Sequence, residues 1–165
     1  MRRPVATVPG PGQVSVWDFP RPPRLEQVAR PVRVEFGGQV IAATTRALRV
    51  CETASPPTYY LPREDVELGV LTEAPGGSFC EWKGIATYWT VRAGSHEAPS
   101  AAWSYRSPSP RFALLRDHLA FYPGRMDACY VGDARVLPQP GGFYGGWLTP
   151  DVTGPFKGEP GTGHW

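Results

Sequence analysis

Proline and glycine interrupt this chain so often that long helices are excluded and small sheets joined by irregular segments are favoured. The 165 residues include 20 prolines and 19 glycines. Proline lacks the backbone N–H that helix interiors and central strands need. Disordered chains can be equally rich in both residues, but they lack the 41% apolar and 12% aromatic content found here. We therefore expect a folded, loop-rich domain that is predominantly β.

Alternating side chains are the clearest strand signals in the chain. In VRVEF, residues 32–36, apolar and charged side chains alternate, and a Gly-Gly pair separates this run from a second apolar run at 40–42. This pattern predicts a β-hairpin. A second hairpin is predicted around the two-residue turn Gly132-Asp133. Further strands are expected at residues 46–52, 79–91 and 101–105.

Other segments favour loops and short helices. Prolines frame SPPTYYLP, so we expect a loop there that delivers Tyr59 and Tyr60 from outside the strands. Residues 94–100 also read as a turn or loop. One helical turn is expected in PREDVEL, which begins at Pro62. The best helix candidate is PRFALLRDHL, residues 110–119.

The chain is expected to have three parts. Residues 1–30 form an extended Pro/Arg-rich N-terminal arm, residues 31–150 a single β domain, and residues 151–165 an extended C-terminal tail. In the arm, Trp17 and Phe19 lie between prolines, and an aromatic pair of this kind is expected to hold the arm on the body. The alternative is that the PRPP segment is a polyproline II ligand for a partner protein.

Charge and apolar content argue against two classes of partner. The 17 basic and 15 acidic residues give a formal charge of +2, and no window holds a run of basic residues. A nucleic-acid partner is therefore not expected. The chain has neither the long apolar run of a membrane span nor the apolar core of a signal peptide. We expect no membrane association and a cytoplasmic location.

The cysteines support the same compartment. Cys51, Cys80 and Cys129 are an odd number with irregular spacing and no C-x-x-C pair. This pattern indicates reduced thiols rather than a disulfide framework, and it argues against a structural zinc site. We expect no metal and no cofactor, in a monomer or homodimer.

The segment SFCEWKGIATYW, residues 78–89, is the richest in reactive and aromatic side chains. In a regular strand, Lys83 points to one face and Cys80 and Trp82 to the other. We expect Lys83 to face a site while the other two face the interior. The reverse orientation stays open, as does a bulge at Gly84 that re-aims one of the side chains.

The number of aromatic side chains predicts a binding pocket. There are more tyrosines and tryptophans between residues 59 and 122 than one core of this size can hold. Each has an apolar body and a polar group, so a concave aromatic site suits a flat or sugar-like small molecule. The alternative is that these rings pack loops onto small sheets.

Covalent chemistry is the second possibility. Cys80 or Lys83 would act as nucleophile, with Glu52 or a histidine as the acid-base partner. No spacing links any histidine to Cys80, and a buried structural thiol is the alternative. The glycine-rich PGGFYGGW, residues 140–147, lacks the motif of a phosphate-binding loop and is expected to be closely packed backbone.

Several segments together resemble a family of bacterial and fungal proteins known as domain of unknown function four hundred twenty-seven, with the label nucleotidyltransferase-like. They are SVWDFPRPPR, RALRVCETASPPTYYLPREDV, FCEWKGIATYW, AAWSY, AFYPGRMD and PQPGGFYGGW. The resemblance implies an all-β, β-tent-like fold of two small antiparallel sheets with one or two short helices and long Pro/Gly-rich arms. The zinc-binding C-x-x-C pairs of other β-tent proteins are absent from this sequence, and so is the Gly-Ser and paired-aspartate signature of nucleotide-transfer enzymes.

The positions that match the family's recurring motifs define the expected site. We expect a small-molecule-binding β domain in which aromatic side chains line a pocket and charged side chains supply polarity. The expected ligand-binding residues are Arg46, Glu52, Tyr59, Trp82, Lys83, Tyr88, Trp103 and Tyr105. The alternatives are a transferase or hydrolase that uses Cys80, Lys83 or Glu52 in catalysis, and a protein-interaction module.

Overall fold

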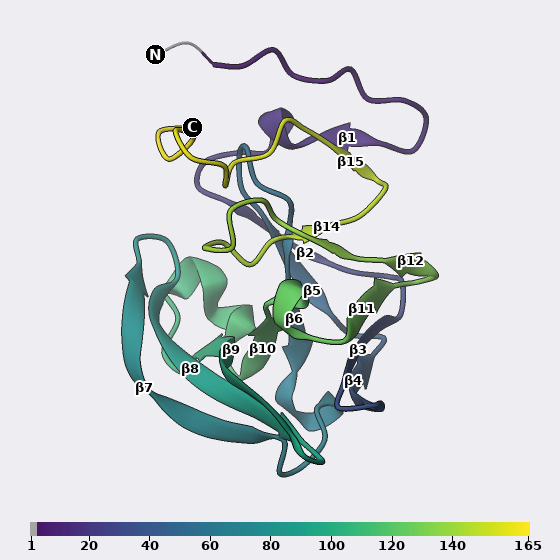
Figure 1. Ribbon diagram of the computed structural model, residues 1–165. Helices are drawn as coiled ribbons and strands as arrows, with labels where there is room; N and C mark the ends of the chain where they lie inside the picture. Colours follow the sequence, from purple (N-terminus) through teal and green to yellow (C-terminus); the bar gives the residue numbers. More distant parts are fainter. Residues whose placement is uncertain (1–2) are drawn as a thin grey trace.

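Strands make up most of the regular structure in the computed structural model, which describes residues 3–165 (Figure 1). The strands are β1 (Val14–Ser15), β2 (Arg24–Gln27), β3 (Val32–Phe36), β4 (Gln39–Thr44), β5 (Leu48–Cys51), β6 (Thr58–Pro62), β7 (Leu71–Cys80), β8 (Gly84–Ala93), β9 (His96–Tyr105), β10 (His118–Phe121), β11 (Ala128–Val131), β12 (Ala134–Arg135), β13 (Leu137–Pro138), β14 (Trp147–Leu148) and β15 (Val152–Thr153). Short 3₁₀ helices are η1 (Val16–Asp18), η2 (Arg63–Asp65), η3 (Pro110–Leu115) and η4 (Pro123–Arg125).

Two antiparallel sheets form the body. The larger has seven strands in the order β2-β5-β6-β10-β9-β8-β7, and the smaller has four in the order β12-β11-β3-β4. Two further pairs are small: β1 runs parallel to β15, and β13 runs antiparallel to β14. The predicted all-β class with antiparallel sheets is therefore confirmed, although the helical segments of residues 3–165 are all 3₁₀ turns.

Both predicted hairpins are present. In β3, the side chains of Val32, Val34 and Phe36 are buried, as their alternation with charged residues predicts. The turn to β4 contains Gly37 at φ 63°, and a Cβ atom there would lie 2.5 Å from the carbonyl oxygen of Ala93. Glycine is required at this position both by the backbone conformation and by the close approach of β8. Gly132-Asp133 connects β11 to β12.

The main core lies between the two sheets. It combines valines of β3 with side chains of the larger sheet, including Leu61 and Phe121, which are fully buried. Trp147, from the glycine-rich segment, enters this core: its ring stacks on Tyr59 with centroids 5.1 Å apart, and its Nε1 donates to the Phe121 carbonyl at 2.9 Å. The glycine-rich segment is thus part of the packing of the body.

Tyr59 and Tyr60 lie in a strand, contrary to the loop expected from the prolines around them. The prolines only bound the strand, because Pro56 and Pro57 precede β6 and Pro62 ends it. In between, β6 pairs with both β5 and β10, and both tyrosines are buried. Proline at the end of a strand does not break its interior hydrogen bonds.

The helix predicted at 110–119 is also corrected. Only Pro110–Leu115 is helical, as the 3₁₀ helix η3, and a left-handed residue, Asp117 at φ 57°, separates it from β10. Leu119 is buried because β10 pairs with β6 and β9. Of the segment 94–100, expected as a turn or loop, only Gly94 and Ser95 form a turn, and His96 begins the ten-residue β9. Strand pairing overrode the local signals in both places.

The two ends of the chain pack against each other (Figure 1, top). Trp17 and Phe19 are buried, as predicted, and Trp17 Nε1 donates to the Pro155 carbonyl at 2.9 Å. The Trp17 ring also contacts that of Trp165, with centroids 5.4 Å apart. Within the arm predicted at 1–30, β2 pairs with β5 as the outer strand of the larger sheet.

Arg49, at the centre of β5, connects these segments. Its guanidinium forms ion pairs with Glu26 of β2 and, at 3.2 Å, with Asp151 of the tail, and it donates to the Tyr59 hydroxyl at 3.3 Å. Only 16% of its side chain is exposed. Burial by itself would raise the pKa of Glu26 and of Asp151, but hydrogen bonds and the charge of Arg49 outweigh it, so both pKa values are lowered.

None of the helices in residues 3–165 combines the length and the apolar character needed to cross a bilayer.

Replacing Arg49 by Met is expected to destabilise the fold. Arg49→Met leaves two partly buried carboxylates without their shared cation, so the free energy of unfolding at pH 7 should fall by about 2–3 kcal/mol. The two carboxyl pKa values are lowered in the folded state from 4.5 and 3.8. The stabilisation is therefore present above these values and is lost as the pH falls through the lower folded pKa values. Urea unfolding as a function of pH measures both effects, and the acid dependence should be shallower in Arg49→Met.

The matched control is Arg92→Met, which removes an ion pair with Glu97 whose arginine side chain is 61% exposed. Exposed pairs contribute less than about 1 kcal/mol. Equal destabilisation of the two variants would show that Arg49 does not hold the segments together.

Candidate functional site

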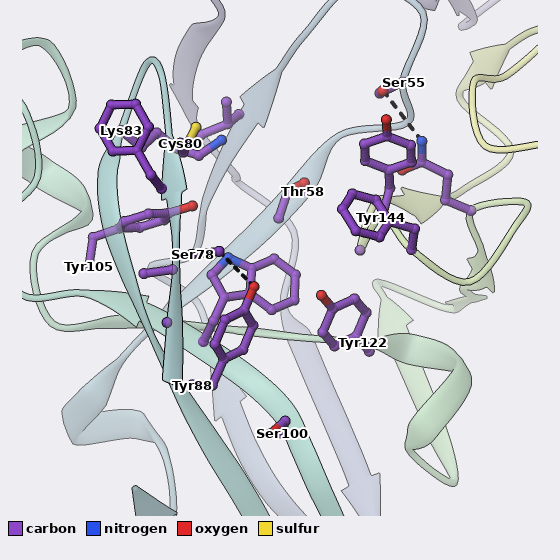
Figure 2. A pocket seen from close by; sticks show the side chains of 18 of the residues that line it. Ser55, Thr58, Ser78, Cys80, Lys83, Tyr88, Ser100, Tyr105, Tyr122 and Tyr144 are labelled. Carbon is purple, nitrogen blue, oxygen red and sulfur yellow. Dashed lines mark hydrogen bonds between the residues drawn. The ribbon is translucent and has the colours of Figure 1, made fainter. Parts of the chain in front are cut away.

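A cleft of about 820 Å³ opens on the larger sheet. Its floor comes from β5, β6, β8 and β9; one wall is the β7–β8 hairpin, and the facing wall is the glycine-rich segment that includes Tyr144 (Figure 2). Tyr122, Arg125, Glu52 and Ser55 also line the cleft. Side chains that are far apart in sequence therefore share one concave surface.

Aromatic side chains form most of the floor. Trp103 contacts Tyr122 with ring centroids 4.7 Å apart, and Tyr60 lies 6.4 Å from Tyr105. Burial raises the pKa of Tyr60 and of Tyr105. Their hydroxyls therefore stay protonated at neutral pH and act as neutral hydrogen-bonding groups.

The β7–β8 hairpin supplies one wall and the reactive side chains. The hydroxyls of Ser78 and Tyr88, on adjacent strands, form a 2.7 Å hydrogen bond inside the cleft (Figure 2). β7 ends at Cys80, which pairs with Gly84, so residues 81–83 form the turn. The predicted alternation through this segment does not apply, and Cys80, Trp82 and Lys83 all line the same cleft. Gly84 is the first residue of β8, next to the turn, and not a bulge within a strand.

Lys83 is held in this turn and is 8% exposed. Its carbonyl accepts a 3.1 Å hydrogen bond from the Ser109 backbone, and the Ser109 hydroxyl donates to the carbonyl of Trp82. Its Nζ lies 5.9 Å from the centre of the Tyr105 ring, near the limit of a cation–π contact. Within residues 3–165, Lys83 takes part in no ion pair.

The other two catalytic candidates, Cys80 and Glu52, also line the cleft. Cys80 is partly exposed, whereas Cys51 and Cys129 are buried. Glu52 directly follows β5 and is half-buried, and it too has no ion-pair partner in the described part of the chain. None of the histidines is among the lining residues, so a thiol mechanism would have no histidine base at this site.

The glycine-rich wall is held by Gln139, whose side chain is buried. Its Oε1 accepts from the Gly146 backbone at 3.1 Å, and its Nε2 donates to the Lys157 carbonyl at 2.8 Å and to the Ser55 hydroxyl at 3.4 Å. Gly145 packs directly on the Trp103 ring, where a Cβ atom would lie 2.1 Å from Cη2. The segment is closely packed backbone, as predicted, but it also forms part of the cleft.

Two exposed aromatic side chains mark the rim. Phe79, on the hairpin, and Phe143, on the glycine-rich wall, both line the cleft, and each is 76% exposed. The predicted ligand-binding set contains none of Phe143, Tyr144, Tyr60 and Tyr122, although the last two belong to the surplus of aromatic residues that predicts a pocket. The signal for the first two was the pair of rings inside PGGFYGGW, which was interpreted only as packed backbone.

Six of the eight predicted ligand-binding residues line the cleft: Glu52, Trp82, Lys83, Tyr88, Trp103 and Tyr105. The other two lie elsewhere. Arg46 is on the surface and forms ion pairs with Glu64 at 3.2 Å and Asp65 at 3.1 Å. Tyr59 is in the core between the sheets, because neighbouring side chains of β6 point to opposite faces and Tyr60 faces the cleft.

Comparison with known proteins adds one finding. A family model described as "Domain of unknown function (DUF427)" matches residues 24–132. No curated protein matches the chain. The matched range contains Glu52, Lys83 and Tyr105, whereas the wall that carries Tyr144 lies beyond it.

A side chain at position 145 is expected to disturb the cleft. Gly145→Ala places a methyl group within 2.1 Å of Trp103, so either the ring or the wall must move. Such overpacking costs about 1–3 kcal/mol of unfolding free energy. Urea unfolding measures this loss, and the indole N–H resonance of Trp103 should shift in a ¹H–¹⁵N NMR spectrum.

Gly163→Ala is the control, because no atom lies within 4 Å of the added Cβ. Its stability should stay within about 0.5 kcal/mol of wild type. If Gly145→Ala were as stable as this control and left the Trp103 resonance unmoved, the close contact would be refuted.

Proposed function

The chain belongs to the DUF427 family, whose description assigns no activity, and from the geometry of its cleft we propose that it binds a flat small molecule that carries an acidic group. The family resemblance found in the sequence is confirmed by this membership. The substrate class is inferred from the side chains of the cleft alone.

The size and lining of the cleft support a small-molecule ligand. Its volume of about 820 Å³ lies within the range of about 300–1,000 Å³ that is usual for such sites. Trp103, Tyr105 and Tyr122 give the cleft an apolar aromatic lining, and Ser78 and Tyr88 add hydroxyls. A flat ring or a sugar face fits such walls because it contacts aromatic rings over a large area.

The inference that the ligand has an acidic group rests on a single observation, the environment of Lys83. Lys83 is 8% exposed as a residue, but its ammonium nitrogen is not a buried unpaired atom, so it is open to the cleft and can take an anionic partner there. In the described residues Lys83 has no such partner, and it lines the cleft. A carboxylate or phosphate on the ligand supplies that partner, while Glu52 accepts a hydrogen bond from a ligand hydroxyl or amine.

A matched-pair thermal-shift screen tests the proposal. Nucleotides, sugar acids and aromatic acids are each compared with neutral analogues, such as the amide of the same acid. A ligand at a hundred times its Kd adds about 2.7 kcal/mol of apparent stability, so a specific acid should raise Tm clearly and its amide should not. In Lys83→Gln the difference between acid and amide should disappear.

Arg46→Gln is the control, since Arg46 is a surface cation outside the cleft. It should keep the full response to the acid. The proposal fails if no acid in the panel is preferred over its neutral analogue, or if Arg46→Gln abolishes the preference as completely as Lys83→Gln.

A second candidate function, a transferase or hydrolase with Cys80 as nucleophile, is favoured by one observation: of the cysteines, Cys80 alone is partly exposed, and it lines the cleft beside Lys83. In this reaction the sulfur would attack an electrophilic carbon and the leaving group would depart with the thiol proton. Thiolate reactivity requires both exposure and an accessible proton acceptor.

Thiol labelling of the folded protein should therefore modify Cys80 first. Burial raises the pKa of Cys51 from 9.0 to about 12, which reduces its thiolate fraction about a thousandfold, and burial also raises the pKa of Cys129. Mass spectrometry after brief treatment with iodoacetamide should find label on Cys80 alone, and on all three after denaturation. Equal labelling rates in the folded protein would remove the thiol candidate.

A further inference from the structure

Lysine occurs twice in this chain: Lys83 lines the aromatic cleft, and Lys157 lines a second hollow that adjoins it. Beside the aromatic cleft lies a smaller chamber of about 230 Å³. The two hollows share lining residues: Glu52, Ser55, Glu81, Trp82 and Tyr144. The cleft and the chamber therefore adjoin at these residues.

The acidic and basic side chains of the chamber differ in whether they also line the cleft. Its carboxylates, Glu52 and Glu81, are shared with the cleft and lie at the junction. Its cations, Arg21 and Lys157, line the chamber but not the cleft, and the same is true of Thr53 and Trp165. The side chains that line the chamber but not the cleft thus include two cations and no carboxylate, whereas both carboxylates belong to the residues shared with the cleft.

Lys157 is held in place by its backbone, which leaves its ammonium group available. Its N–H donates to the Ala54 carbonyl at 2.7 Å, and its carbonyl accepts from Gln139 at 2.8 Å. Its Nζ lies 5.2 Å from the centre of the Tyr144 ring. Every ion pair between side chains of residues 3–165 is made by an arginine, so neither lysine is used to hold the fold together by charge.

We propose that the ligand of the cleft carries a second anionic group, a carboxylate or a phosphate, which Lys157 and Arg21 bind in the chamber. This inference rests on the proposed function, in which Lys83 binds the first acidic group. Lysine offers a flexible point charge and arginine a planar fork, and both are suited to these anions. The carboxylates at the junction repel an anion but accept hydrogen bonds, so the ligand has hydroxyl or amino groups between its two acidic ends.

The chamber is built by the two ends of the chain. Arg21 comes from the N-terminal arm, and Lys157 and Trp165 come from the tail, all outside the family-matched residues 24–132. The Trp17–Trp165 contact holds these segments together. The residues proposed to bind the second anionic group therefore lie outside the family-matched range, whereas Lys83 lies within it.

The experiment uses probes with one constant and one variable end. Each is an alkoxynaphthalene sulfonate, whose ring and sulfonate match the cleft and Lys83. Its alkoxy chain, of increasing length, ends in a carboxylate, a phosphonate or, as the neutral match, a carboxamide. At the chain length that reaches the chamber, the carboxylate or phosphonate should bind wild-type protein at least about tenfold more tightly than the carboxamide in calorimetric titration. The stronger of the two acids identifies the chemistry of the second group.

Variants separate this inference from the proposed function. In Lys157→Gln and in Arg21→Gln, the charged and neutral probes should bind with similar affinity, while the carboxamide probe keeps its wild-type affinity. In Lys83→Gln, the carboxamide probe itself should bind more weakly. Arg92→Gln, an exposed site on β8, should match wild type with every probe.

Two outcomes would overturn the inference alone. One is that the carboxamide probes bind in a Lys83-dependent manner but no length shows a preference for an acidic end. The other is that the preference exists and survives in both Lys157→Gln and Arg21→Gln. If none of the probes binds at all, the proposed function fails for this ligand class and the second site falls with it.

Discussion

The arrangement of the two chain ends depends on the charge network around Arg49. This guanidinium lies on β5, next to the edge strand of the larger sheet, and contacts Glu26 on β2, Tyr59 on β6 and Asp151 in the tail. Because this one partly buried cation is shared by carboxylates of the arm and of the tail, it ties both segments to the larger sheet. Because the arm and the tail carry Arg21, Lys157 and the aromatic contacts between them, the same network determines whether the polar chamber exists.

The two faces of β6 pack into different parts of the molecule, one into the core and one into the cleft. Tyr59 packs on Trp147 in the core between the sheets, while Tyr60 faces the cleft beside Tyr105. Trp147 belongs to the same glycine-rich stretch whose Gly145 lies on Trp103. Core and cleft therefore share their walls, and a substitution that loosens this stretch should be felt in both.

The two lysines define the chemistry proposed for the cleft and the chamber. The structure uses arginine for its ion pairs, while Lys83 and Lys157 lie near tyrosine rings in two adjoining hollows. The family-matched residues include Lys83 and the aromatic residues of the floor, while the terminal segments supply the second pair of cations, Arg21 and Lys157. A ligand with a flat body and two separated acidic groups satisfies both, which unites the proposed function with the anchoring of the termini.

Local patterns in the sequence determined the all-β class, the hairpins at 32–44 and 127–137, the family, and six of the cleft residues. These features follow from alternation, turn residues and motifs, each of which acts within a few neighbouring positions. Only the tertiary structure decided that Tyr59 and Tyr60 lie in a central strand, that 118–121 is β10 rather than helix, and that Arg46 is outside the cleft. Likewise, the turn at 81–83 brought Cys80 and Lys83 into one cleft, and packing of the termini placed Lys157 beside it. The physical reason is that strand pairing and burial depend on partners distant in sequence, and these partners override local propensity.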